Sequence, residues 1–204
     1  MRKTVRGSWF VASLLVLGTG LVACGPQESG RIKSDDEADL VGSRQAGAAT
    51  YQEIVSEAVA GLLSSHSAAH EGPGRYTIGI VGIDVRGAED LGDWEEQLYE
   101  VLANSVDASE SYHSVSRRAL DRGLLEAELR VEDLFLPKYR RELVRVMEAD
   151  GNPVQLLIFP NLTTGTTVRG SEKQRDYLMT LELVDVATGW EDRFSGKVRK
   201  AYTD

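Results

Sequence analysis

The chain has 204 residues, with 23 basic and 32 acidic side chains and a formal net charge of −9 at neutral pH. Three basic and no acidic residues lie in the first 23 positions, so 20 basic and 32 acidic residues give the remainder a charge of −12. Such a chain repels nucleic-acid phosphates, which argues against nucleic acid as a partner. About 155 residues after a short tether suffice for one ordinary domain.

The chain opens with the pattern of a secretory signal peptide. Three basic residues precede an apolar run, Trp9–Leu17, which is too short to span a membrane. The segment Leu21-Val22-Ala23-Cys24 looks like a bacterial lipobox, which implies a signal peptide at 1–23 and lipidation of Cys24. Gly25 resembles the pattern that sorts lipoproteins to the outer membrane. The alternative is an ordinary cleaved signal with a spare cysteine. The sole cysteine can form no internal disulfide.

Residues 24–48 are expected to form the lipidated cysteine and a flexible tether. They contain few large apolar groups and an acidic cluster, Asp35-Asp36-Glu37, so they cannot bury enough surface to offset the entropy of ordering. Residues 49–204 are expected to form one globular domain. This organisation would hang the domain from a membrane through the lipid on Cys24.

The first half of the domain predicts a helix, a strand and a second helix. Thr50 and Glu53 match a capping box, so the first helix should begin near Thr50. Its apolar stripe is Ile54, Ala58, Leu62 and Leu63. A Gly-Pro-Gly cluster at 72–74 should end this helix. A strand is expected at Tyr76–Ile83, then a polar loop over residues 84–93, then a helix at Trp94–Val106.

The middle of the chain predicts a short strand and two helices. The strand is expected at Tyr112–Ser116, and the next helix at Arg117–Arg130. Pro137 should open the second helix, because proline suits a first helical turn, and Gly151 should stop it.

The last third predicts three antiparallel strands. Pro160 cannot donate to a ladder, so it places the first of them at an edge or a bulge. The last strand alternates, with Trp190, Phe194, Val198 and Tyr202 on one face and Glu191, Arg193, Lys197 and Arg199 on the other. The expected strands and turns are Val154–Leu162, a turn at Gly170-Ser171, Tyr177–Val186, a turn at Ala187-Thr188-Gly189, and the final strand.

These elements predict an α/β (α+β) fold. The expected order is α-β-α-β-α-α-β-β-β, forming a single domain in which helices pack on one mixed β-sheet that ends in an antiparallel meander.

Few residues suggest chemistry. His66 and His70 stand four apart and could share a metal with Glu71, but a site needs three or four ligands, so two solvated histidines are the preferred interpretation and no metal or cofactor is expected. Asp84 follows the first strand, with no second acid or nucleophile at a recognisable spacing, and is interpreted as a loop hydrogen-bonding residue. There is neither a phosphate-binding glycine loop nor a serine elbow, so no enzyme is predicted.

Two further segments have competing interpretations. Lys138, Arg141 and Arg145 could line one helix face, with Glu142 and Glu148 interleaved, which favours a solvated face over a partner patch. Leu134-Phe135-Leu136 is interpreted as core, with a docking hook as the alternative.

The stretch Tyr177–Gly189, with its Leu-Val-Asp segment and Thr-Gly turn before a tryptophan-led strand and Lys197–Lys200, resembles the LpoB-type lipoprotein activators of penicillin-binding proteins. Their domain is related to the TolB amino-terminal domain and to curli-secretion lipoproteins. The resemblance covers roughly residues 50–202. It also rests on the lipobox and tether, on the first helix and strand, and on the strand and helix around Ser114–Glu128. It departs at Gly151-Asn152-Pro153-Val154 and at Pro160-Asn161, and the tether is shorter than in the best-known members.

The resemblance implies an outer-membrane accessory protein that faces the periplasm, binds a penicillin-binding protein and stimulates peptidoglycan synthesis without doing chemistry itself. The alternative is an envelope binding, secretion or assembly accessory on the same fold. Four residues of the meander are the expected partner contacts: Arg169, Lys173, Arg193 and Arg199.

Overall fold

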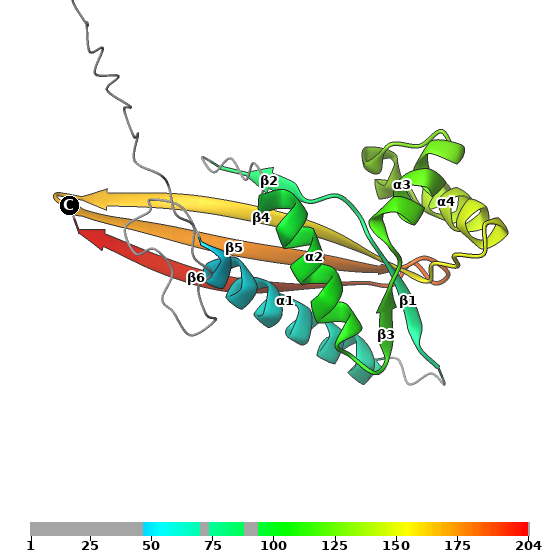
Figure 1. The fold of residues 1–204 in the computed structure, drawn as a ribbon, viewed down its shortest axis with the longest axis horizontal. Helices are drawn as coiled ribbons and strands as arrows, with labels where there is room; N and C mark the ends of the chain where they lie inside the picture. The colour runs from blue at the N-terminus through cyan, green and yellow to red at the C-terminus, as the bar shows by residue number, and fades with distance from the viewer. Residues whose placement is uncertain (1–46, 70–73, 88–93, 204) are drawn as a thin grey trace, which may run out of the picture. The chain divides into compact units, whose positions relative to one another are not determined.

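The computed structural model describes residues 47–69, 74–87 and 94–203 (Figure 1). The predicted signal peptide, Cys24, His70, Glu71 and nearly all of the predicted tether lie outside these residues. The elements are α1 (Ala48–Ala69), β1 (Tyr76–Ile80), β2 (Asp84–Arg86), α2 (Trp94–Asp107), β3 (Tyr112–Ser114), α3 (Arg117–Glu126), a 3₁₀ turn η1 (Val131–Phe135), α4 (Pro137–Ala149), β4 (Leu156–Arg169), β5 (Glu172–Asp185) and β6 (Glu191–Thr203).

Helix α1 begins two residues before the position that the capping-box pattern predicts. The amides of Thr50 and Tyr51 both donate to the Gly47 carbonyl, at 3.0 and 3.3 Å, so Thr50 lies in the first turn. Its side chain is buried. The prediction was wrong because two alanines, which are favourable helix formers, extend the helix toward its N-terminus. The predicted apolar stripe is confirmed, since all four of its residues are buried.

A six-stranded mixed sheet organises the domain. Its order is β3-β1-β4-β5-β6, with β2 pairing β4 beyond the end of β1. The pairs β1–β3, β1–β4 and β2–β4 are parallel, whereas β4–β5 and β5–β6 are antiparallel. The predicted fold class, with helices on a mixed sheet that ends in an antiparallel meander, is confirmed.

Pro160 explains why the predicted single strand at Tyr76–Ile83 is interrupted. The Val81 amide donates to the Ile158 carbonyl at 2.9 Å, and in a parallel ladder the next donor would be residue 160. Proline has no amide hydrogen, so the ladder stops there. It resumes in β2 with its register shifted by one residue, since Ile80 pairs with Ile158 but Asp84 pairs with Asn161. β4 is an inner strand of the sheet, so the expectation that Pro160 marks an edge strand was wrong. The alternative, a bulge, corresponds to the interruption of the ladder between β1 and β2 opposite Pro160.

The chain between α3 and α4 turns earlier than its leucine spacing predicts. Helix α3 ends at Glu126, and Glu128 adopts a left-handed conformation with φ of 56°. Residues 131–135 then form η1 rather than a continuation of the helix. Pro137 occupies the first turn of α4, as predicted, and Gly151 follows the helix with a positive φ of 75°.

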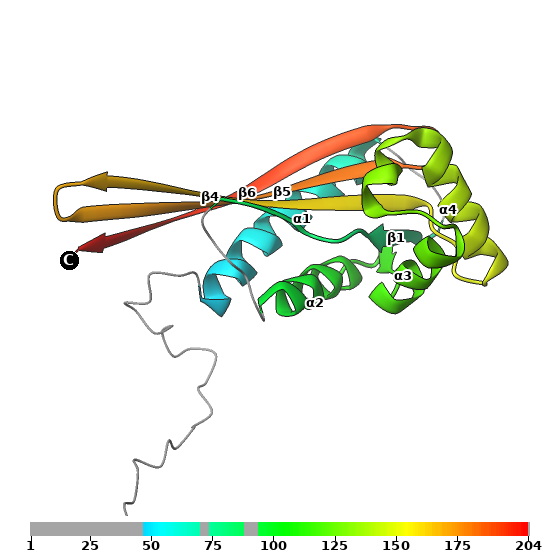
Figure 2. The same cartoon turned by 90° about the horizontal axis from the view of Figure 1, so that it is seen from above.

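Two helical layers cover different parts of the sheet. Helices α1 and α2 pack on one face, where they bury side chains such as Ile158 and Leu162 of β4. Helices α3 and α4 and the η1 turn pack on the other face at one end of the sheet, against Leu157 and Phe159. Figure 2 shows α2 below the strands and α1 crossing them diagonally, with α3 and α4 at the right-hand end of the sheet.

The two hairpins of the meander form at the predicted turns. Gly170 and Gly189 have φ of 61° and 74°, a region that glycine enters without steric cost. The Asp185 carboxylate accepts from the Thr188 amide at 2.7 Å, which fixes the second turn. Strands β4 and β5 have 14 residues each. β4 extends past its predicted end at Leu162 and β5 begins before its predicted start at Tyr177, because the runs Gly165–Arg169 and Glu172–Asp176 pair with each other.

Helix α1 lies unusually close to the backbone of β6. A Cβ at Gly196 would overlap the Ile54 carbonyl oxygen, and the Phe194 ring occupies the space beside Gly61. The absence of side chains at these two glycines therefore allows α1 to pack on the edge strand of the sheet.

We expect Gly196→Ala to lower the free energy of unfolding by about 1–3 kcal/mol, because the added methyl must displace the helix backbone. The matched control is Gly165→Ala on β4, where a Cβ meets nothing within 4 Å. Urea unfolding followed by circular dichroism measures both. Equal stability of the two variants would contradict this account of the packing.

Candidate interaction surface

The face of the meander opposite α1 is polar and is not covered by a helix along much of its length. We call it the open face and define it by nine residues of β4, β5 and β6. They are Asn161, Thr163, Asp176, Thr180, Glu182, Arg193, Ser195, Lys197 and Arg199. None of these residues is fully buried.

Cross-strand pairs hold the side chains of the open face in register. Arg193 donates to Glu182 at 2.6 Å, and Arg199 donates to Asp176 at 2.8 Å. The hydroxyls of Thr180 and Ser195 lie 2.9 Å apart. The opposite-charge pairs contribute stability of about 0.2–1 kcal/mol each, so they order the surface more than they stabilise the fold.

The structure brings together only part of the predicted contact set. Arg193 and Arg199 both lie on the open face. Arg169 has the same alternation but lies next to the Gly170-Ser171 turn, at the far end of β4. Lys173 points to the opposite face, because it pairs with Val168 and Tyr202. Nothing among these placements tests partner contact, so the four remain proposals.

Asp176 is the carboxylate on which the cations of the open face converge. Hydrogen bonds from Arg199 and Gln174 lower the pKa of Asp176 below its ordinary value, and the nearby charges of Arg199 and Lys197 act in the same direction. Lys197 lies 4.0 Å from the carboxylate. One carboxylate thus faces two cations.

A groove of about 320 Å³ runs between η1 and the open face. Phe135 forms part of its wall and stacks on Phe159 with ring centroids 5.8 Å apart. Phe135 and Leu136 are 66% and 51% exposed, whereas Leu134 is buried. The interpretation of this tripeptide as core was therefore right for Leu134 and wrong for the other two, because the 3₁₀ turn directs only Leu134 inward.

His66 is fully buried, so its interpretation as a solvated residue was wrong. Its Nδ1 lies 2.7 Å from the Tyr112 hydroxyl, and its ring packs edge-on against those of Tyr76, Tyr112 and Trp190. The sequence did not reveal this role because the segments that supply the rings, β1, β3 and the residue before β6, are distant from α1 along the chain. Within the described ranges no group of three or more His, Cys, Asp or Glu residues could hold a metal ion.

A cavity of about 610 Å³ lies between α2, β3 and the start of α3. Asp107 accepts hydrogen bonds from the Ser114 hydroxyl at 2.9 Å and from His113 Nδ1 at 3.0 Å. Because the serine bonds to the carboxylate and not to the imidazole, the histidine is not placed to take the serine proton. Burial raises the pKa of Tyr99, which lines the same cavity, to about 12, although Arg117 opposes the shift.

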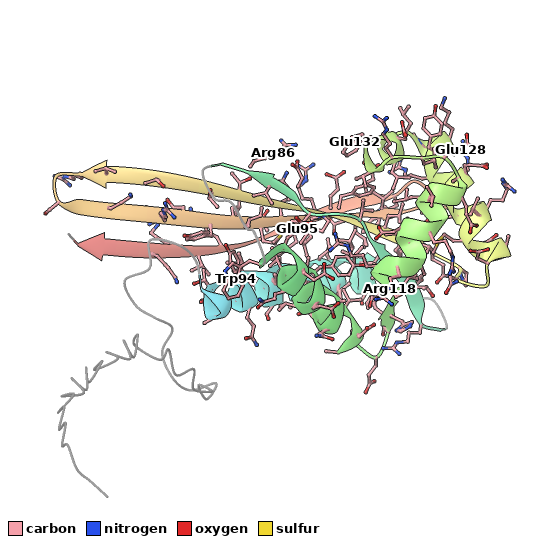
Figure 3. The ribbon with its side chains drawn as sticks, turned by 45° about the horizontal axis from the view of Figure 1, so that its top comes forward. Arg86, Trp94, Glu95, Arg118, Glu128 and Glu132 are labelled. Atoms are coloured by element: carbon pink, nitrogen blue, oxygen red, sulfur yellow. The ribbon has the colours of Figure 1, made fainter. Side chains whose placement is uncertain are left out.

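The remaining sequence candidates are surface residues. Asp84 accepts from Arg86 at 2.8 Å and from Asn161 at 3.0 Å, which is a hydrogen-bonding role on the short strand β2. On α4, Arg145 donates to Glu142 and lowers its pKa, as expected of a solvated amphipathic face. Figure 3 shows the exposed side chains around them, with Arg86 near β2 and Glu128 and Glu132 beside α3. No helix in the described part of the chain is both long enough and apolar enough to cross a membrane.

No family model matches the chain, and no curated protein matches its sequence. Among solved structures, the C-terminal domain of LpoB from Salmonella enterica is 18% identical and covers 74% of this chain and 98% of its own, with a TM-score of 0.41. LpoB from Escherichia coli is 13% identical and covers 97% of this chain and 93% of its own, with a TM-score of 0.44. A lipoprotein from Neisseria meningitidis is 16% identical, with coverage of 63% and 84% and a TM-score of 0.42. LpoB-type domains, which the sequence predicted, are therefore among the structures that this chain resembles.

We expect Arg199→Met to raise the pKa of Asp176 toward its ordinary value, because the substitution removes the strongest hydrogen bond to the carboxylate. The pKa of Asp176 is lower in the folded protein than in the unfolded chain. Asp176 therefore stabilises the fold above its unfolded pKa, and this stabilisation is lost as the pH falls through the folded pKa. NMR titration of the side-chain carboxyl carbon measures the change, with Arg118→Met on α3 as the control. An unchanged Asp176 titration in Arg199→Met would refute the assignment.

Proposed function

We propose that this protein is an outer-membrane lipoprotein, anchored through Cys24 and facing the periplasm, whose domain binds and stimulates a peptidoglycan synthase of the penicillin-binding protein class. Residues 24–48 act as the tether and residues 49–204 as the binding domain. The single observation that carries the proposal is the open face, a surface three strands wide whose charged side chains are held by cross-strand pairs. Such a surface suits another protein better than a small molecule, which would need a concave, mostly apolar site.

Preorganisation favours this role. The ion pairs and the Thr180–Ser195 contact already restrict the side chains of the open face. Less rotamer entropy is then lost when a partner binds. The adjoining groove adds an exposed aromatic ring, Phe135, next to this polar surface. Polar contacts beside an aromatic anchor are the usual composition of a protein interface.

Activation is proposed to work by a population shift. An accessory protein that binds the active conformation of a synthase better than the inactive one raises the active fraction without contributing a catalytic group. The partner class comes from the sequence resemblance, carried by the stretch Tyr177–Gly189 and the lipobox. The proposal assigns no cofactor and no metal.

If the protein is anchored through Cys24 as proposed, Cys24→Ser abolishes incorporation of labelled palmitate and moves the protein from the membrane fraction to the soluble fraction. The cysteine sulfur is the atom to which the diacylglycerol would be attached. Ser29→Ala, five positions further on, keeps the cysteine and serves as the control. Palmitate incorporation into the Cys24→Ser protein would exclude this anchor.

If the partner is a penicillin-binding protein as proposed, immobilised residues 25–204 enrich a bifunctional penicillin-binding protein from detergent-solubilised membranes. Mass spectrometry identifies the bound protein, and a glycan-polymerisation assay then measures stimulation. We expect Arg193→Glu combined with Arg199→Glu to lower the enrichment at least tenfold, because both residues lie on the open face.

Arg118→Glu is the matched control, since Arg118 is exposed on α3, away from the meander. Enrichment of secretion or assembly proteins without any synthase would instead assign the domain to the alternative accessory role.

A further inference from the structure

The outer edge of β6 is a free strand edge in the described part of the chain, because β6 is the last strand of the sheet. In an antiparallel pair, alternate residues bond toward the partner strand and away from it. The Asp185 amide donates to the Trp190 carbonyl at 2.8 Å, which fixes the even-numbered residues of β6 as those that bond to β5. The amides of the odd-numbered residues therefore point outward.

The structure shows which groups accept hydrogen bonds from the outward amides of this edge. The outward amide of Lys197 donates to the Glu57 carboxylate of α1 at 3.0 Å. The outward amide of Arg193 donates to the carboxylate of its neighbour Asp192 at 2.8 Å. Two carboxylates thus satisfy donors along the edge where α1 covers it. Further along, no residue in the described ranges accepts from the amides of Arg199 and Ala201, where β6 runs past the start of α1 (Figure 1).

Side chains along this edge carry an excess of positive charge in an otherwise acidic protein. Lys197 and Arg199 share the single carboxylate of Asp176, at 4.0 and 2.8 Å. Lys200 points to the other face, and no acid among the described residues forms an ion pair with it. Cations therefore flank the edge on both faces of the sheet.

We propose that the edge of β6 from Arg199 to Thr203 docks an extended acidic segment of a partner protein by strand addition. The outward amides and carbonyls would supply the main-chain hydrogen bonds. Acidic side chains of the added strand would lie beside Lys197 and Arg199 on one face and Lys200 on the other, where opposite charges in neighbouring strands attract. This inference does not depend on the identity of the partner proposed above.

Charge decides against a second copy of this chain as the occupant. Two β6 edges paired with each other would bring Lys197, Arg199 and Lys200 of one copy against the same cations of the other. Like charges in neighbouring strands are destabilising. An acidic strand removes this repulsion and matches the carboxylates that already satisfy Arg193 and Lys197.

The test uses residues 25–204 and a fluorescein-labelled ten-residue peptide that alternates glutamate and valine. Fluorescence anisotropy at low salt should show saturable binding that weakens as salt is added. A peptide with lysine in place of glutamate should bind at least tenfold more weakly. So should an acidic peptide N-methylated at alternate residues, because it cannot complete the ladder.

Two proline variants locate the binding edge. Ala201→Pro removes an outward amide of β6, and we expect binding of the acidic peptide to fall at least tenfold. Thr166→Pro is the matched control, since Thr166 also has an outward amide but lies on the opposite edge, in β4. Proline is tolerated at outward positions of edge strands, and near-ultraviolet circular dichroism checks that both variants fold. Arg199→Glu, which leaves the backbone unchanged, should weaken binding by a similar factor.

Three outcomes would overturn the proposal. The first is equal binding of the glutamate and lysine peptides, or no binding of either. The second is a loss of binding in Thr166→Pro with none in Ala201→Pro. The third is a concentration-dependent dimer in sedimentation that Ala201→Pro abolishes, which would assign the edge to a second copy.

Discussion

Strand β4 is the constraint on which the rest of the domain depends. Its first seven residues, Leu156–Leu162, bury side chains on both faces of the sheet, so both helical layers pack against this one strand. The same residues pair with β5 on one side and with β1 and then β2 on the other. After Thr163 the parallel partners end, and the strand continues with β5 alone. A buried half and an exposed half of one strand thus define where the core ends and where the proposed binding surfaces begin.

The exposed half is kept ordered by polar interactions. Beyond the helices no apolar layer covers the open face, so its strands depend on ladder hydrogen bonds and on pairs such as Glu182–Arg193 and Asp176–Arg199. These pairs are exposed to water and contribute little stability individually. They do fix where the charges lie, and this is the arrangement that the proposed partner would contact. Positive and negative charges are not balanced along β6, because Asp176 faces two cations. The excess positive charge lies at the free edge.

Three features of the domain therefore suit protein recognition: the open face, the Phe135 groove beside it, and the basic edge of β6. In the cavity between α2, β3 and α3, Asp107 accepts hydrogen bonds from both Ser114 and His113, so these two residues do not form a nucleophile–base pair. Proposed binding and proposed activation need only differential affinity for two states of a partner.

The sequence by itself determined the mixed sheet, both glycine turns, the buried stripe of α1 and the order of helices and strands, except for β2, which lies where a polar loop was expected. These features follow from local periodicity and from backbone preferences that act over a few residues. Tertiary structure alone decided the early start of α1, the break between β1 and β2 opposite Pro160, and the length of β4 and β5, because each depends on a partner distant in sequence. It also decided that His66 is buried among rings from three other strands or turns, and that Phe135 is exposed. For the candidate site, alternation placed Arg193 and Arg199 on one face, but only the register of β5 and β6 revealed that Lys173 points to the other side and that the edge beyond Lys197 is free.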